Sequence, residues 1–459
     1  MRTTFATCFL LWIVLFGAST AMNPRREEED WKREREREWE GEDEEEWKGH
    51  GHEGFLLRDL KKVIKTPAGY MEVARNIDHW ALERPMHIGF LTMEPKTLFI
   101  PQYMDTNLII FIRRGAAKLG VIYKDELSEL QLKIGDIYRI PAGSVFYLVN
   151  TGEGQRLHVI CSIDPSESTR TGYFQSFFVG GGTNPSSVLS GFGPETLSTA
   201  FNVTIDELGV LMEGQQEGPI VFLEDSVSPR RTNWSKFLQV QKQRLERAED
   251  EPEWVWRKLF ETFVGKQNKK STTKRGKSPD SYNIYDRRHD FSNDYGWSIA
   301  LDESDYNPLK HSGIGVYLVN LTAGSMMAPH WNPRATEYGV VLKGSGKIHI
   351  VYPNGTRALS AEVNEGDVFW IPRFFPFCQI ASRTGPFEFF GFTTSAQKNR
   401  PQFLAGASSV LRTVEGPELA ASFGVNEEDL RSFLRAQRES IILPSAAVSP
   451  PYRKTEKKQ

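Results

Sequence analysis

The chain has 459 residues, of which 39% are hydrophobic and 12% aromatic, a composition typical of globular proteins. Its length excludes a single small domain and is sufficient for two or three. Its 56 Lys and Arg residues against 59 Asp and Glu residues give a net charge of −3. This balance excludes an overall positive field, so nucleic-acid binding would require a local basic patch.

Residues 1–21 have the features of a secretory signal peptide. The apolar run Phe9–Phe16 is followed by small residues that end at Ala21, after which we expect cleavage. The run is shorter than the roughly 20 residues needed to cross a bilayer, and no later stretch supplies them, so we expect no membrane anchor. Two cysteines remain, Cys161 and Cys378, and we expect both to be buried free thiols.

Residues 22–54 form an acidic leader. Between Met22 and His50 there are 13 acidic and 7 basic residues, with tryptophans as the main apolar side chains. Such a segment buries too little apolar surface to order itself, so we expect it to be disordered. A secretory route also makes N-glycosylation relevant, and four Asn-x-Ser/Thr sequons are candidate acceptors: Asn202, Asn233, Asn320 and Asn354.

The rest of the chain contains an internal repeat. The segment Gly135–Pro141 (GDIYRIP) returns as Gly366–Pro372 (GDVFWIP), and Ser187-Val188-Leu189 returns as Ser409-Val410-Leu411. Two copies of one module therefore follow each other, which we place at residues 55–245 and 286–444. We assign 246–285 to a helical and then basic, flexible linker, and 445–459 to a disordered tail.

Each copy begins with strands and ends with helices. Short apolar or alternating runs bounded by Gly, Pro and Asn predict strands at 108–112, 117–123, 145–149 and 347–352. Helical spacing follows in both copies, with Thr204 and Asn426 as expected N-caps. The apolar faces of these helices are predicted to contain Val188, Leu189, Leu197, Phe201, Leu208 and Leu211 in the first copy and Val410, Leu411, Leu419, Phe423, Leu430 and Phe433 in the second.

Glycines bound a pattern of polar residues in the second copy. Gly324, His330, Asn332, Glu337 and Gly344 have the spacing of the first cupin motif, which they closely resemble, and Gly366 with Pro372 resembles the second. A secreted double cupin with helical extensions, an acidic leader and a basic linker is similar to the vicilins, the seed storage globulins of plants. The resemblance implies a mainly β fold: two tandem cupin jelly-roll barrels, each with a C-terminal α-helical extension.

The same resemblance identifies candidate ligands of a metal ion. In metallocupins His330 and Glu337 would be ligand positions, but Asn332 replaces the second histidine and Phe377 the third, with Cys378 beside it. We therefore expect Asn332 and Tyr338 to line a pocket in the second barrel. The corresponding positions of the first copy imply that its barrel has no metal site of the cupin type: Pro101, Tyr103, Leu108 and Phe146.

These substitutions argue against catalysis. Cupin oxidases and decarboxylases need several imidazoles and a carboxylate around a divalent ion, and only one of the nine histidines falls at a motif position. A mixed site of His330, Glu337 and Cys378 would suit copper or zinc. Strand alternation opposes it, because Cys378 points outward if Phe377 points inward. A polar remnant that holds water or a small anion is the favoured interpretation.

The resemblance implies that the protein is a nutrient reservoir and not a catalyst. We expect a homotrimer in which the helical tail of one module docks against the next, delivered through the secretory pathway to protein storage vacuoles and degraded during germination. The alternatives are extracellular secretion, and a binding protein that takes a metal or small anion in its second barrel. The storage role requires no cofactor, no nucleic acid and no membrane.

Overall fold

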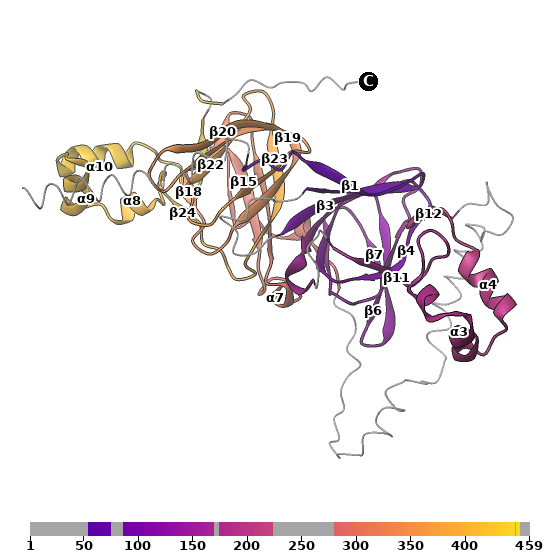
Figure 1. The fold of residues 1–459 in the computed structure, drawn as a ribbon. Coiled ribbons are helices and arrows are strands. Elements are labelled where there is room, and N and C mark those ends of the chain that lie inside the picture. The colour runs from indigo at the N-terminus through magenta and orange to yellow at the C-terminus, as the bar shows by residue number, and fades with distance from the viewer. Residues whose placement is uncertain (1–53, 75–85, 169–173, 224–279, 446, 450–459) are drawn as a thin grey trace, which may run out of the picture. The chain divides into compact units, whose positions relative to one another are not determined.

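The computed structural model describes residues 54–74, 86–168, 174–223, 280–445 and 447–449 (Figure 1). The expected signal peptide, nearly all of the acidic leader, the sequon at Asn233 and most of the linker lie outside these residues. Within them the fold is mainly β, as the sequence predicts, and two barrels follow each other along the chain.

Two sheets form the first barrel. One contains, in spatial order, β1 (Leu60–Thr66), β2 (Gly69–Ala74), β3 (His87–Met93), β10 (Leu157–Asp164), β5 (Asn107–Arg114), β8 (Asp136–Ile140) and β13 (Tyr282–Asn283). The other contains β11 (Ser176–Phe178), β4 (Thr97–Met104), β9 (Phe146–Asn150), β6 (Ala117–Tyr123) and β7 (Glu126–Leu132), and β12 (Ile220–Phe222) pairs with β4. Their inward side chains form one continuous apolar core.

One twelve-stranded sheet wraps into the second barrel. Its main path is β14 (Phe291–Asn293), β15 (Gly296–Leu301), β16 (Gly315–Leu321), β23 (Phe387–Thr393), β19 (Glu337–Val351), β22 (Phe377–Ala381), β17 (Ser325–Met327) and β25 (Ile442–Pro444). Further strands join this path: β18 (His330–Trp331), β20 (Arg357–Asn364), β21 (Val368–Ile371) and β24 (Gln402–Phe403). All four strand positions predicted from the sequence are strands in the structure.

The long strand β19 belongs to both layers of the second barrel. Its first half pairs with β21 and β23, and its second half pairs with β20 and β22. The change occurs at Gly344, where φ is +81° and a Cβ atom would lie 1.8 Å from the carbonyl oxygen of Pro386. In the first barrel, β5 and β6 are separate strands with Gly115 between them, also at positive φ. Glycine is thus needed at the same point of both repeats.

Short helices follow each barrel. The first set contains the 3₁₀ helix η2 (Val188–Phe192), α3 (Pro194–Phe201) and α4 (Ile205–Glu213), and the second contains α8 (Val410–Thr413), α9 (Pro417–Phe423) and α10 (Glu427–Arg435). The remaining helices are α7 (Leu309–Ser312) and the 3₁₀ helices η1 (Pro165–Glu167) and η3 (Ile284–Asp286). None of the helices in the described segments is long and apolar enough to span a bilayer.

Both predicted N-caps are confirmed. The Thr204 hydroxyl accepts the backbone N–H of Glu207 at 3.2 Å, and the Glu207 carboxylate accepts the backbone N–H of Thr204 at 2.9 Å. This reciprocal pair is a capping box. In the second copy, Asn426 Oδ1 accepts the backbone N–H of Asp429 at 2.8 Å. Each cap satisfies a backbone donor that the first turn of a helix would otherwise leave unpaired.

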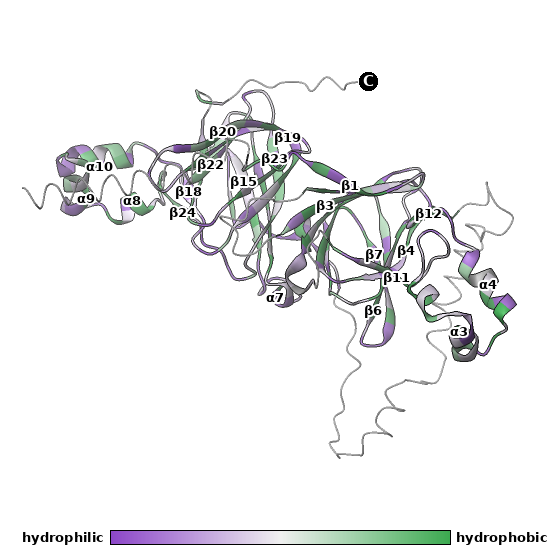
Figure 2. Ribbon diagram, viewed as in Figure 1, coloured by the Kyte–Doolittle hydropathy of each residue, from purple (hydrophilic) through white to green (hydrophobic). Residues whose placement is uncertain are grey.

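The predicted apolar helix faces are only partly covered within one chain. Leu197 and Leu430 are buried, whereas the side chains of Phe201, Phe423 and Phe433 are 51%, 59% and 77% exposed. Figure 2 shows these helices as a mixture of hydrophobic and hydrophilic residues. A large exposed phenylalanine on a short helix leaves apolar surface in contact with water, so the helical tails have a face that a further partner could cover.

Each barrel pairs with a short segment from outside its own repeat. Residues 55–57 precede the first barrel but pair with β21 of the second, where Leu56 forms a β-bridge with Phe369 and the Leu57 N–H donates to the Val368 carbonyl at 2.8 Å. In return β13, which precedes the second barrel, pairs with β8 of the first. Our boundaries, which start the first module at residue 55 and end the linker at residue 285, stay a prediction. The pairing shows that residues 55–57 contact a strand of the second barrel and that residues 282–283 contact a strand of the first.

Side chains also connect the barrels. The rings of Phe111 and Phe390 stack with centroids 3.9 Å apart. Arg113 donates to the Leu342 carbonyl at 2.9 Å and to the Glu365 carboxylate at 2.6 Å. The stacked pair is fully buried, which makes this contact a continuation of the two cores.

Candidate functional site

The interior of the first barrel is almost filled. It contains a cavity of only about 30 Å³, lined by apolar side chains and Cys161. Leu108 and Phe146, which stand at cupin ligand positions, are among these lining residues. Tyr103 instead stacks on Phe177 with ring centroids 4.8 Å apart. The volume is that of a single water molecule, but apart from the weakly polar Cys161 thiol the lining side chains are apolar and offer a water too few hydrogen-bonding partners.

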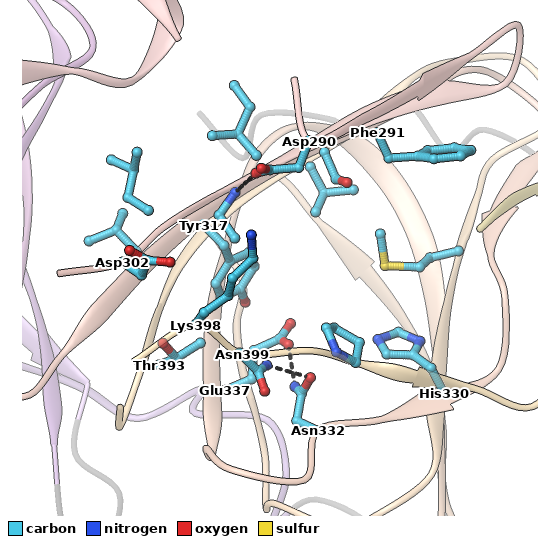
Figure 3. Close-up of a pocket in the computed structure, with 18 of the residues that line it drawn as sticks. Asp290, Phe291, Asp302, Tyr317, His330, Asn332, Glu337, Thr393, Lys398 and Asn399 are labelled. Atoms are coloured by element: carbon cyan, nitrogen blue, oxygen red, sulfur yellow. Dashed lines mark hydrogen bonds between the residues drawn. The ribbon is translucent and has the colours of Figure 1, made fainter. Parts of the chain in front are cut away.

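The second barrel encloses a cavity of about 330 Å³ (Figure 3). Polar side chains gather at one end: His330, Asn332, Glu337, Thr393 and Asn399. The walls are apolar and include Ile299, Val316, Val319, Met327, Phe389 and Phe403. Charged residues also contribute: Arg287, Asp290, Asp302 and Lys398. An apolar chamber with a few convergent polar groups is the usual form of a small-molecule site.

His330 is held in place by its backbone and by aromatic rings. It begins β18, and its Nδ1 lies 2.7 Å from the Ala328 carbonyl oxygen. The ring centroids of Phe377 and Phe403 lie 4.1 and 5.0 Å away. Burial lowers the pKa of His330 to about 4, although the Ala328 carbonyl opposes this effect. The imidazole is therefore neutral at physiological pH.

Glu337 is the first residue of β19 and is buried at the polar end of the cavity. Its Oε2 accepts from Asn332 Nδ2 at 2.9 Å, and its Oε1 lies 3.4 Å from the Gln379 amide nitrogen. Burial raises the pKa of Glu337 to about 7, while hydrogen bonds from Tyr317 and Asn332 favour the carboxylate. A raised pKa is expected for this carboxylate, because it is buried and receives hydrogen bonds from amides but forms no salt bridge.

Asn399 completes this polar cluster and was not foreseen from the sequence. Its Nδ2 donates to Asn332 Oδ1 at 2.7 Å, which links Asn399 to Glu337 through Asn332 (Figure 3). Its own Oδ1 is buried and has no hydrogen-bond partner. Asn399 lies in an irregular segment after β23, where no periodic pattern marks the direction of a side chain. No motif in the sequence therefore indicates that Asn399 lies at this site.

Tyr338 and Cys378, both of which we expected at this site, lie elsewhere. Tyr338 follows Glu337 on β19, so its side chain points to the opposite face, where it stacks near Trp370 with centroids 6.5 Å apart. Tyr317 of β16 lines the cavity instead, and its hydroxyl donates to the Tyr338 carbonyl at 3.1 Å. Tyr338 therefore supports the site only through its backbone.

Cys378 is also separated from His330 and Glu337. It pairs with His349 in the register of β19 and β22, and it is absent from the cavity lining. Burial raises the pKa of its thiol to about 11, so it is protonated. Among the residues that the structure describes, no three or more His, Cys, Asp or Glu side chains are grouped to hold a metal ion. The mixed copper or zinc set is therefore not assembled in this structure, because strand alternation turns Cys378 away.

The described sequons differ in their surroundings. Asn354 lies exposed in the turn between β19 and β20, where its Oδ1 accepts from the Thr356 backbone N–H at 3.0 Å. Asn202 is exposed at the left-handed C-cap of α3. Asn320 lies half-buried within β16, and its amide donates to Glu388 at 3.2 Å.

Both cysteines are free and buried, as expected.

The chain is similar to known proteins along most of its length. A family model described as Cupin matches residues 282–431. A vicilin-like seed storage protein of Arabidopsis thaliana is 56% identical over 418 residues, which cover 87% of this chain and 81% of that protein. A second vicilin-like seed storage protein of the same organism is 32% identical over 384 residues, covering 78% and 68%.

Solved structures give the same fold. The vicilin from Capsicum annuum superposes with a TM-score of 0.72 at 21% identity, covering 85% of this chain and 100% of that one. The vicilin from Corylus avellana has a TM-score of 0.70 at 22% identity, with coverages of 85% and 99%. Two tandem barrels with helical extensions are thus an arrangement that this chain has in common with both.

Proposed function

This chain belongs to the vicilin-like seed storage proteins, and from that premise we propose that it is a nutrient reservoir, laid down in seeds and degraded during germination. The observation that carries the proposal is the identity to a vicilin-like seed storage protein over most of both chains. The well-filled first barrel supports it, since a dense core protects a protein from proteolysis until exposed segments are cut.

The same role requires no catalysis and no cofactor. A storage protein acts through its mass, and among the residues that the structure describes the polar end of the second cavity offers one imidazole, His330, and one carboxylate, Glu337. A copper or zinc ion bound there would have too few protein ligands to be fixed in the geometry that cupin oxidases use. We therefore place this protein among the members that are not enzymes.

We further propose that the protein is a homotrimer assembled through its helical tails. The exposed phenylalanines at 201, 423 and 433 supply apolar surface on both tails. Because the two modules are repeats of each other, the tail of one can meet the next in a closed ring. Closed symmetry would cover every such face, whereas a single chain leaves them in water.

For its location we propose the secretory pathway and the protein storage vacuole, with extracellular secretion as the alternative. The signal peptide expected at residues 1–21 and the exposed sequon at Asn354 support this route. We propose Asn354 as the main acceptor, because a turn between two strands can present its side chain to a transferase without unfolding the barrel. Nucleic acid and membranes are not partners in this role.

Quantitative mass spectrometry of developing and germinating seeds tests the proposal. We expect the protein to accumulate to a major share of seed protein, to co-fractionate with storage vacuoles and to decline within days of imbibition. A low level in mature seeds, or a level that stays constant through germination, would refute the storage role. Recovery from the apoplast instead of vacuoles would favour the extracellular alternative.

A further inference from the structure

We propose that charged side chains decide which helical tail meets which when chains assemble: arginines at the end of the second tail bind carboxylates on the first tail of another chain. This inference rests on the proposed trimer and adds to it the residues that select the pairing. It is carried by opposite charges at equivalent positions of the two tails.

The two tails correspond residue by residue. The first tail, residues 187–217, and the second tail, residues 409–439, are related by a constant shift in numbering, which also relates their N-caps Thr204 and Asn426. The helices that follow these caps, α4 and α10, both have nine residues, and the fourth residue of each is a buried leucine. Equivalent surface residues can therefore be compared one by one.

The first tail is acidic along its whole length. It contains no lysine, arginine or histidine and five acidic residues: Glu195, Asp206, Glu207, Glu213 and Glu217. Glu213 lies in the last turn of α4, where the partial negative charge of the helix end disfavours a carboxylate. It is exposed and forms no ion pair with the residues that the structure describes. A cation from another chain would compensate this unfavourable position.

The second tail carries arginines at the equivalent end. Arg431 and Arg435 lie four residues apart on α10, so they share one side of the helix, and Arg438 follows shortly after the helix ends. Arg435 corresponds to Glu213, so the charge is reversed at this position of the repeat. The acidic residues of α10 lie in its first turn, where the helix end favours them: Glu427, Glu428 and Asp429.

The second tail does not neutralise these arginines by itself. Arg431 donates to Glu415 at 2.8 Å and Arg435 donates to the same carboxylate at 3.3 Å, so two guanidinium groups share one negative charge. Both side chains remain more than half exposed. Arg438 is exposed and has no ion pair within the described segments. Positive charge and N–H donors are therefore left for a carboxylate of another chain.

These charges distinguish the possible pairings. Two first tails would bring carboxylates together, and two basic ends of second tails would bring guanidinium groups together, whereas a first and a second tail bring opposite charges together. The mixed pairing is also the one by which identical chains close a ring, since each chain offers a different surface to each neighbour. Exposed apolar side chains such as Phe201 and Phe433 supply contact area, and the charges supply the selectivity.

Charge reversals test the pairing in the full-length protein. Arg435→Glu and Glu213→Arg each place like charges at the junction, so each should raise the concentration at which half of the chains are trimeric by about tenfold or more. The double variant restores opposite charges at every junction and should return this concentration to within about threefold of the wild type. Light scattering coupled to gel filtration measures it in a dilution series at low salt.

Controls separate the contact between chains from effects within one chain. Lys310→Glu reverses an exposed cation on α7, outside both tails, and should change the midpoint concentration less than twofold. Arg435→Glu also removes the contact with Glu415, but Glu213→Arg in the other tail would not repair that loss, so rescue in the double variant identifies pairing between tails. Circular dichroism and melting temperature establish folding, and Arg438→Glu replaces Arg435→Glu if the latter is unfolded.

High salt provides an independent readout. Because ions screen exposed charges, the difference between each single variant and the wild type should shrink at high NaCl concentration. A difference that persists undiminished, single reversals without effect, or a double variant as weak as the single ones would each overturn this inference and leave a wild-type trimer standing. A wild-type protein that is monomeric at every concentration would refute the proposed trimer and this inference together.

Discussion

Leu56 and Phe369 form a β-bridge that joins the segment before the first barrel to a strand of the second. The flanking bonds, from the Leu57 N–H to the Val368 carbonyl and from the Trp370 N–H to the Phe55 carbonyl, extend it to a short strand pair. Since β13 pairs with β8 in the opposite direction of exchange, each barrel completes a sheet with residues from outside its own repeat. The barrels are therefore held together by more than the peptide that connects them.

A cut in the chain between residues 224 and 279 should leave both parts associated. We expect the two fragments to co-elute from a gel-filtration column in native buffer and to separate only in denaturant. The physical reason is that the exchanged strands, the stacked pair Phe111 and Phe390, and Arg113 with Glu365 all remain intact. A recognition site for a specific protease, inserted in this region, restricts the cut to one position. Separate elution of the fragments under native conditions would contradict it.

Phe55 should contribute strongly to the stability of the second barrel. Its side chain is 3% exposed and packs against Trp370 and Phe375, with ring centroids 5.6 and 6.2 Å away. Phe55→Ala should reduce the free energy of unfolding by about 3 kcal/mol, the lower part of the range for buried phenylalanines. Leu60→Ala, at an exposed edge position, is the control and should change it by less than about 0.5 kcal/mol. Urea denaturation followed by tryptophan fluorescence measures both; equal effects would contradict the prediction.

Glu337→Gln should gain stability relative to the wild type as the pH rises. The pKa of Glu337 is raised from 4.5 to about 7, so between these values the native state holds a proton that the unfolded state has released. That group therefore lowers stability as pH rises through this window, by roughly 3 kcal/mol in total, and glutamine removes the effect. Urea denaturation of both proteins from pH 4 to 8 measures the difference.

His330 makes an opposing contribution to the wild-type profile. Its pKa is lowered from 6.5 to about 4, so the native state releases a proton that the unfolded state keeps, and stability rises with pH between these values. The comparison must therefore be between variant and wild type at each pH, and not between pH values of one protein. A difference between the two proteins that does not change with pH would show that Glu337 titrates normally.

Phe433→Glu should weaken the proposed trimer. The Phe433 side chain is 77% exposed on α10, so a charged residue there should leave the single chain folded. Light scattering coupled to gel filtration should show a shift from trimers towards monomers at micromolar concentration. Phe374→Glu is the matched control, because Phe374 is 56% exposed but lies outside the helical tails. Equal behaviour of the two variants would argue against assembly through the tails.

Metal analysis should find copper and zinc well below one atom per chain in protein purified without chelators or affinity tags. His330→Ala should not change this content, because the described residues contain no set of ligands around His330. Cys378→Ser is the control, since Cys378 faces away from the cavity. A near-stoichiometric metal that disappears in His330→Ala alone would revive the metal-binding interpretation.

The sequence predicts local features of this fold well. The caps at Thr204 and Asn426 depend on side chains that bond within three residues of themselves, and the repeated Gly135 and Gly366 mark turns of fixed geometry. Periodicity of two is equally local, which explains why the strand positions are confirmed. The resemblance to cupins correctly predicted that His330 and Glu337 lie at one cavity. Both residues belong to one motif of fixed spacing, which is also a local feature of the sequence.

Features that depend on distant pairing are not visible in the sequence. Leu56 is one apolar residue in a short run, and nothing in its neighbourhood indicates Phe369 as its partner. Asn399 reaches the cavity from an irregular segment, and Tyr317 reaches it from another strand. Tyr338 was assigned to the pocket by its proximity to Glu337, although adjacent residues of a strand point to opposite faces. The alternation of side chains between the two faces of a strand would have placed Tyr338 correctly.

The exchange of strands also dictates an order of events during synthesis. Phe55, Leu56 and Leu57 leave the ribosome early, but the backbone of β21 that pairs with them emerges only after the whole first barrel and the intervening chain. Three consecutive apolar residues therefore remain without their partner strand until β21 has been synthesised. Unpaired apolar segments of this kind favour wrong association during folding, so synthesis of the second barrel ends the period in which the nascent chain is most exposed to it.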